Sequence, residues 1–196
     1  KSGEALQGTH ASVEIGSNQA VGLRASHGTK FSNGANWVFS ASRYKTKGQD
    51  FFFPDIAANN GQAQGIDGDS NHRLYSKLDY NGFIASAALV SRTKELPTAS
   101  FGAEFGASST RTTDRQTTLD LRHKGETPAG TLISHVYLAN YYYKGIYVYD
   151  KANAITNDDT GKGSWWGADL RLLNTSLKNH KLVMGMEFEN DFRQIQ

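Results

Sequence analysis

The stretch from Arg73 to Phe105 decides how this sequence is expected to fold; it reads RLYSKLDYNGFIASAALVSRTKELPTASFGAEF. Two alternating runs, 73–80 and 83–93, meet across Asn81-Gly82. This dipeptide predicts a two-residue type I′ turn, because both turn positions need positive φ. After residue 93 the alternation gives way to a long loop rich in small residues. A tight turn at one end and a long loop at the other form one unit of an up-and-down antiparallel sheet.

Composition sets limits on the class of protein. The chain has 196 residues, a net charge of +2, no Cys, 20 Gly and 3 Pro. Its length predicts one domain. The even charge balance argues against a nucleic-acid partner, which would need clustered Lys and Arg. The lack of Cys excludes disulfides and thiolate metal sites. Abundant Gly, Asn, Thr and aromatic residues favour strands and turns over helices.

The same alternation recurs along the chain and predicts nine strands. They are expected at residues 9–15, 20–30, 35–45, 73–80, 83–93, 115–123, 131–144, 164–174 and 181–192. Long loops are expected at 45–72, 94–114 and 145–163, all at one end of the sheet, with short turns at the other end. This asymmetry is typical of outer-membrane β-barrels, whose strands need about 9–11 residues to cross a bilayer. No apolar run approaches the roughly 20 residues of a transmembrane helix.

The two faces of the predicted strands differ in polarity. One face is apolar, and the other carries a charged set that suits a wet lumen better than a dry core. That set comprises Arg24, Asp120, Arg122, Asp169, Arg171, Glu187 and Glu189. Aromatic residues gather near strand ends, as in an interfacial girdle; they are Trp37, Tyr141, Tyr142, Tyr143, Trp165 and Trp166. A half-exposed sheet of a soluble protein would also show alternating apolar and polar residues along its strands. The loop asymmetry, however, favours the barrel.

Several segments, in this order, resemble the TonB-dependent receptors, which are outer-membrane active transporters of Gram-negative bacteria. They are 40–42 with 47–54, 66–68 with 73–78, 91–94 with 96–102, 145–149, 165–168, 185–188 and 191–194. The segment containing Leu96-Pro97-Thr98-Ala99-Ser100-Phe101-Gly102 is the most particular. Each motif is weak alone, but their ordered succession spans nearly the whole chain.

The resemblance implies an all-β, antiparallel, up-and-down transmembrane barrel of about 22 strands, of which about nine are present here as a fragment. It implies uptake of a scarce large solute, such as a ferric siderophore, across the bacterial outer membrane. The implied partners are the plug and later strands of the receptor, TonB acting through the missing plug, outer-membrane lipid and an extracellular ligand. We therefore expect the N-terminal part of a receptor barrel. The alternative is a small non-transporting barrel or an adhesin-like structural protein that pairs to cover its sheet edges.

Five aromatic residues fall in loops that should be wet: Phe51, Phe52, Phe53, Phe101 and Phe105. They either pack the loops against one another or line a ligand vestibule. Aromatic pockets with few polar anchors are how such vestibules are generally built, so these residues are the candidate ligand-binding set.

Possible metal and catalytic sites are few. Asp67, Asp69 and Asn71 offer oxygen ligands at alternate positions, as at the start of a calcium loop. However, His72 stands where an EF-hand needs Gly, and Leu78 where it needs Glu, so a polar turn is the alternative. No other cofactor is expected. Ser134 and His135 are neighbours on a strand and point to opposite faces, which argues against a nucleophile–base pair and against an enzyme.

Overall fold

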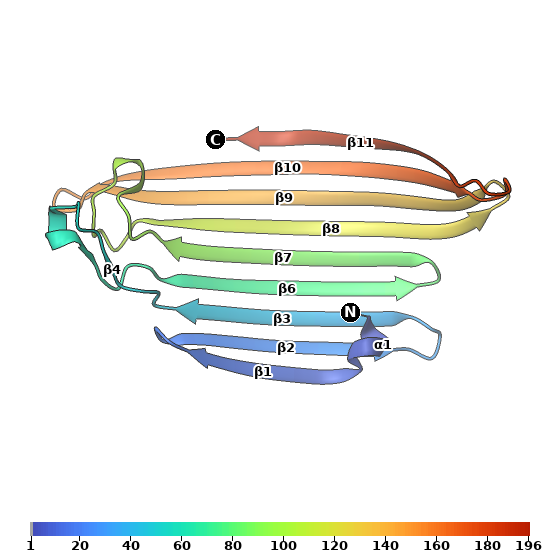
Figure 1. Cartoon of the computed structure of the whole chain (residues 1–196), viewed down its shortest axis with the longest axis horizontal. Helices are drawn as coiled ribbons and strands as arrows, with labels where there is room; N and C mark the ends of the chain where they lie inside the picture. The colour runs from blue at the N-terminus through green and yellow to red at the C-terminus, as the bar shows by residue number, and fades with distance from the viewer. Residues whose placement is uncertain (1) are drawn as a thin grey trace.

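The computed structural model describes residues 2–196, which form an all-β chain built on one nine-stranded antiparallel sheet (Figure 1). Its strands are β1 (Gly8–Gly16), β2 (Ala20–Lys30), β3 (Asn36–Thr46), β6 (Asp69–Tyr80), β7 (Phe83–Glu95), β8 (Arg111–Thr127), β9 (Gly130–Asp150), β10 (Ile155–Asn174) and β11 (Leu182–Ile195). Each strand pairs with the next one along the chain. The prediction of nine antiparallel strands in up-and-down order is confirmed. Within residues 2–196 the sheet stays open, since β1 and β11 do not pair and no barrel closes.

The turn at Asn81-Gly82 has the expected geometry. Asn81 has φ 49° and Gly82 has φ 80°, and Tyr80 pairs with Phe83 across the turn. A Cβ at Gly82 would lie 2.5 Å from the Lys124 carbonyl oxygen. Gly82 is therefore required both by its backbone angle and by the close approach of β8.

The predicted third long loop at 145–163 is wrong. β9 continues to Asp150 and β10 begins at Ile155, so four residues connect them. The consecutive Tyr residues and the Gly and Asp residues of 141–163 disguise the alternation, because Gly and Asp are poor strand formers. Hydrogen bonding to the neighbouring strand overrides that local preference. The other two long loops are present but shorter than predicted, at 47–68 and 96–110.

The register separates the sheet into two faces. One row of paired residues runs from His27 through Phe39, Ser76, Ala87, Leu119, Leu138 and Trp166. We call the face with this row the apolar face, and the opposite one the polar face. The apolar face carries an apolar belt that crosses all nine strands. Its larger members include Val13, Leu23, Leu74, Leu78, Leu119, Leu121, Val136, Trp166, Leu170, Met184, Met186 and Phe188, all of them exposed.

The charged residues predicted to share a face all lie on the polar face, as the register requires. The register divides the six residues of the predicted aromatic girdle between the two faces, and an interfacial girdle stays a prediction. Trp37, Tyr142 and Trp166 lie on the apolar face, whereas Tyr141, Tyr143 and Trp165 lie on the polar face. Consecutive residues on a strand alternate sides, so three successive Tyr cannot all face the same medium.

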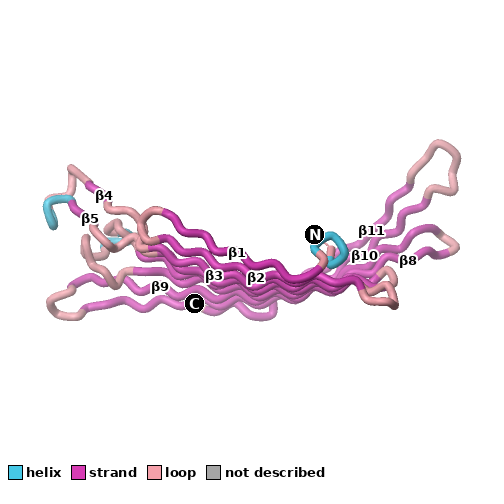
Figure 2. Tube along the Cα trace, turned by 90° about the horizontal axis from the view of Figure 1, so that it is seen from below, coloured by secondary structure: helices cyan, strands magenta, loops and turns pink. Residues whose placement is uncertain are grey.

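The short elements lie at the two ends of the sheet. Loop 47–68 contains β4 (Phe51–Phe52), the 3₁₀ turn η1 (Ala58–Gly61) and β5 (Gln62–Ala63), and loop 96–110 contains η2 (Ser100–Gly102). Helix α1 (Gly3–Leu6) lies against the polar face at the other end, where the Glu4 N–H donates to Asn36 Oδ1 at 3.0 Å. Seen edge-on, the sheet is a single curved layer with α1 on its concave side (Figure 2). None of the helices in residues 2–196 is long and apolar enough to span a membrane.

Candidate functional site

The loops at one end of the sheet pack into a folded unit. Phe53 of loop 47–68 meets Phe105 of loop 96–110 edge to face, with ring centroids 5.7 Å apart. Ala63, Ile66 and Phe105 are buried, and Phe53 and Ile56 pack around them. Gly61 has φ 70°, and a Cβ there would lie 2.2 Å from the Phe53 carbonyl oxygen. This hydrophobic cluster is built from loop residues rather than from the sheet.

Backbone and side-chain hydrogen bonds fasten this unit to β9. The Glu104 N–H donates to the Val148 carbonyl at 2.7 Å, and the Lys151 N–H donates to Glu104 Oε2 at 2.5 Å. The Thr110 hydroxyl accepts from the Val148 N–H at 3.3 Å, and Thr110 is buried. Loops 47–68 and 96–110 and the end of β9 therefore form one body, which Figure 1 shows at the left end of the sheet.

The five candidate Phe residues divide into two groups. Phe53 and Phe105 pack the loops together, as the first interpretation of these residues predicts. Phe51 is intermediate, since it contacts Phe53 at 6.1 Å between centroids and is 37% exposed. Phe52 and Phe101 are 67% and 80% exposed. Only these three remain available to a ligand, and ligand binding by them stays a prediction.

Phe101 also has an unusual backbone. Its φ is 57°, and its ring lies edge-on to Tyr147 at 5.5 Å. A bulky residue with positive φ is a genuine outlier, and such strain costs on the order of 1–3 kcal/mol. The surrounding loop holds an exposed aromatic ring in a strained conformation, which is a common property of ligand-contacting residues.

A polar pocket of about 600 Å³ lies beneath the loops on the polar face. Glu14, Tyr44, Asp67, Asp69 and Lys94 are among its lining residues. The Lys94 ammonium contacts the Asp67 carboxylate and donates to the Asp67 carbonyl at 2.5 Å. Asp69 Oδ1 is buried, and within the described residues it has no hydrogen-bond partner. Buried acceptors are normally satisfied, so this oxygen can accept a bond from a donor group that enters the pocket.

The possible calcium ligands are already paired with cationic side chains. Arg92 donates to Asp69 Oδ2 from Nε at 2.9 Å and from Nη2 at 2.5 Å, while Lys94 holds Asp67. Asn71 lies on the polar face with Asp69, two residues along β6. Within residues 2–196, no group of three or more His, Cys, Asp or Glu side chains converges on a point that could hold a metal. The geometry favours the polar turn, and calcium binding stays a prediction.

Other polar contacts follow the sheet register, which sequence reasoning could not supply. Asp120 accepts from His135 and forms an ion pair with Arg122 at 3.1 Å on the polar face. Ser134 lies on the apolar face opposite Leu170. Ser134 and His135 are therefore separated by the sheet, as neighbours on a strand must be.

The tight connection between β9 and β10 is stabilised by Asp150. Its carboxylate accepts from the Asn153 side-chain amide at 2.7 Å and from the Asn153 N–H at 2.9 Å. These two bonds lower the pKa of Asp150. The sequence offered a signal for this turn, since Asp and Asn are both frequent in turns, but it lay inside the predicted long loop.

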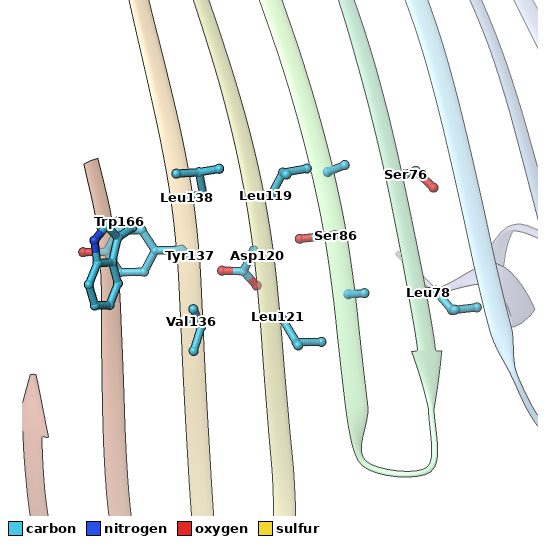
Figure 3. A pocket seen from close by; sticks show the side chains of 12 residues that line it. Ser76, Leu78, Ser86, Leu119, Asp120, Leu121, Val136, Tyr137, Leu138 and Trp166 are labelled. Atoms are coloured by element: carbon cyan, nitrogen blue, oxygen red, sulfur yellow. The ribbon is translucent and has the colours of Figure 1, made fainter. Parts of the chain in front are cut away.

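The apolar face has a shallow groove near its centre, of about 580 Å³ (Figure 3). Its floor is formed by small side chains, Ser76, Ala85 and Ala87, and its walls by the larger residues Leu78, Leu119, Leu121, Val136, Leu138 and Trp166. The groove is open to solvent, and most of the side chains that line it are apolar. It belongs to the apolar belt rather than to the polar pocket.

Comparison with known proteins leaves the family open. No family model matches the chain, and neither a curated protein nor a solved structure matches it. The resemblance to TonB-dependent receptors stays a prediction, and the case for a function depends on the geometry of the two faces and the loop unit.

Proposed function

We propose that this chain forms part of the wall of an outer-membrane β-barrel, in a transporter that takes up a scarce large solute such as a ferric siderophore. Energy would come from TonB through a plug inside the barrel, as the sequence resemblance implies. The observation that carries the membrane part of the proposal is the path of the apolar belt across the sheet.

The belt crosses the strands obliquely. On β1 it is centred on Val13, and on β11, where it covers residues 182–188, it is centred on Gly185. The row of paired residues that contains Val13 reaches Lys162 on β10 and Ile195 on β11. Gly185 lies ten residues before Ile195 on β11. One of these ten residues is the extra residue of the β-bulge beside Trp165, so it is not counted in the shift. The belt centre thus shifts by about nine residues over eight steps between strands, or about one residue per strand.

This shift gives the angle between the belt and the strands. With about 3.3 Å per residue and about 4.8 Å between strands, the belt departs from the perpendicular by roughly 40°. Transmembrane barrel strands tilt by about 35–45°. A bilayer is a flat slab, so tilted strands that cross it must place their apolar residues along such an oblique line.

The height of the uncharged region agrees with this interpretation. On the apolar face, β7, β9 and β10 carry no Asp, Glu, Lys or Arg over 83–93, 132–142 and 164–174. Eleven residues extend over about 33 Å of strand, which at a tilt of about 40° is about 25 Å along the bilayer normal. The apolar band of outer-membrane barrels is also about 25 Å tall.

The remaining features support a ligand-capturing transporter. The polar face carries ion pairs and a polar pocket, which suit a water-filled lumen. The loop unit at the end of this face exposes Phe52 and Phe101. Helix α1 lies on the polar face at the short-turn end, which is the side where a plug would meet the barrel wall.

Two adjacent Trp residues test the membrane orientation. Trp166 lies on the apolar face and Trp165 on the polar face. In vesicles of lipids with brominated acyl chains, a variant that retains only Trp166 should be strongly quenched. The matched variant that retains only Trp165 should keep most of its emission. Equal quenching of the two, or a monodisperse chain that needs no detergent or lipid, would refute the proposal.

A further inference from the structure

Charged residues on the apolar face gather at one end. The register places Arg43, Lys45, Arg111, Arg115, Lys144, Lys162 and Arg193 on this face, all between the apolar belt and the loop unit. We call this set the basic band. The acidic residues among them are Glu95 and Asp158. At the short-turn end of the same face, the strands carry His, Thr and Asn instead.

Within residues 2–196, most cations of the basic band form no ion pair. On the polar face, Arg92, Lys94, Arg122 and Arg171 each have a carboxylate partner, whereas Arg24, Arg73 and Lys77 form no ion pair within the described residues. In the band, Lys144 pairs with Asp158 at 3.2 Å, at a site where both side chains are solvent-accessible. Among the ion pairs of residues 2–196, Arg43, Lys45, Arg115 and Lys162 have none. The band therefore presents uncompensated positive charge next to an apolar surface.

The densest part of the band surrounds Tyr142. Arg115 and Lys162 flank it in the same row, with their charged groups 5.9 and 6.0 Å from the ring centroid. Lys144 lies two residues further along β9 on the same face. The ring attracts both cations and so orients them, and its hydroxyl adds a hydrogen-bond donor. Three cations and a phenol within two rows of a sheet suit an anion with several oxygens.

The geometry points to a binding site for phosphate-bearing lipid headgroups at Arg115, Tyr142, Lys144 and Lys162. The occupant is an anionic lipid whose acyl chains cover the belt and whose phosphate lies against these four residues. Charge complementarity supports this occupant, since the cations begin where the uncharged region ends. The inference rests on the proposed function, because a lipid can reach both the belt and the band only if the apolar face meets a bilayer.

The test uses the full chain in micelles of a neutral detergent. Dansyl-labelled phosphatidic acid or dansyl-labelled phosphatidylcholine is titrated in, and energy transfer from the Trp residues reports binding. The band variant combines Arg115→Gln, Lys144→Gln and Lys162→Gln. At low salt, each Lys or Arg near an anionic lipid surface contributes about five-fold in affinity. The band variant should therefore bind phosphatidic acid about 100-fold more weakly.

The matched control removes the same charge from the polar face through Arg24→Gln, Arg73→Gln and Lys77→Gln. It should bind phosphatidic acid within about three-fold of the unmodified chain, because no lipid phosphate reaches that face. An equal loss in both variants would overturn the site and show an effect of net charge alone. If calorimetry shows that inorganic phosphate binds the solubilised chain and that the band variant abolishes this binding, the site accepts free phosphate and the lipid inference fails.

The outcomes also separate this inference from the proposed function. If the unmodified chain binds both labelled lipids equally and the band variant changes neither affinity, the lipid site is refuted while membrane insertion stands. If neither lipid binds, and Trp165 and Trp166 are quenched alike in brominated vesicles, both proposals fail.

Discussion

A charge placed at the centre of the apolar belt should separate a membrane barrel from a soluble sheet. Leu119 lies at the midpoint of β8, in the row that joins Ala87 and Leu138 on the neighbouring strands. In a bilayer this row is near the midplane, so Leu119→Arg should cost about 2–4 kcal/mol of unfolding free energy. In water, Leu119 is already 49% exposed. There the same change should cost only about 1 kcal/mol, roughly half the value of burying a Leu side chain.

Two further Arg substitutions on β8 supply the controls. Thr118→Arg alters the neighbouring residue on the polar face and should change stability by less than about 0.5 kcal/mol. Thr113→Arg stays on the apolar face but lies near the loop end, where the cost should fall to about 0–1 kcal/mol. The assay is reversible urea unfolding from lipid vesicles, followed by Trp fluorescence. If all three variants agree within about 0.5 kcal/mol, the bilayer argument is wrong.

Three further changes test the turn, the loop unit and the polar turn. Gly82→Ala should cost more than Gly34→Ala in urea unfolding, by about 1 kcal/mol. Both have positive φ, but only at Gly82 would the new Cβ meet a carbonyl; equal costs would contradict the close approach. Phe105→Ala should destabilise the chain by about 3–5 kcal/mol because Phe105 is buried. Phe101→Ala should change stability little, because the side chain is 80% exposed and Ala keeps the same backbone strain. It should weaken fluorescence-detected binding of a ferric hydroxamate or ferric catecholate siderophore. Unchanged binding of both would remove Phe101 from the ligand site. If residues 67–71 form only a polar turn, calcium should not raise the melting temperature; a rise that Asp69→Asn abolishes would support the calcium site.

The sequence predicted the sheet well because each strand depends on local information. Period-two alternation and turn residues such as Asn81-Gly82 act over a few residues, so they locate strands without knowledge of the fold. The same local reasoning failed at 145–163. There, Gly161 and Gly163 weaken the pattern, and pairing with β9 decides the structure. Where pairing outweighs local preference, a single sequence gives no direct signal.

The candidate site was predicted less completely, for a related reason. The polar pocket joins Glu14 of β1, Asp69 of β6 and Lys94 of β7, which are brought together only by the register of the sheet. The aromatic loop residues were identified from sequence, but their division into packing residues and exposed residues depends on the contact between Phe53 and Phe105. Phe53 and Phe105 are 52 positions apart in the sequence.

The belt and the basic band depend on one register, and short turns hold that register in place. Tyr80 and Phe83 pair across two turn residues, so both side chains lie on the apolar face. One residue inserted at this turn would move every later side chain of β7 to the opposite face. Leu89 would then leave the belt, and Arg92 would leave Asp69 and enter the apolar face. A soluble sheet wet on both faces would tolerate such a slip far better than a wall with lipid on one side and water on the other. The positive φ at both turn positions fixes a two-residue connection, and this connection keeps the register that separates the two faces.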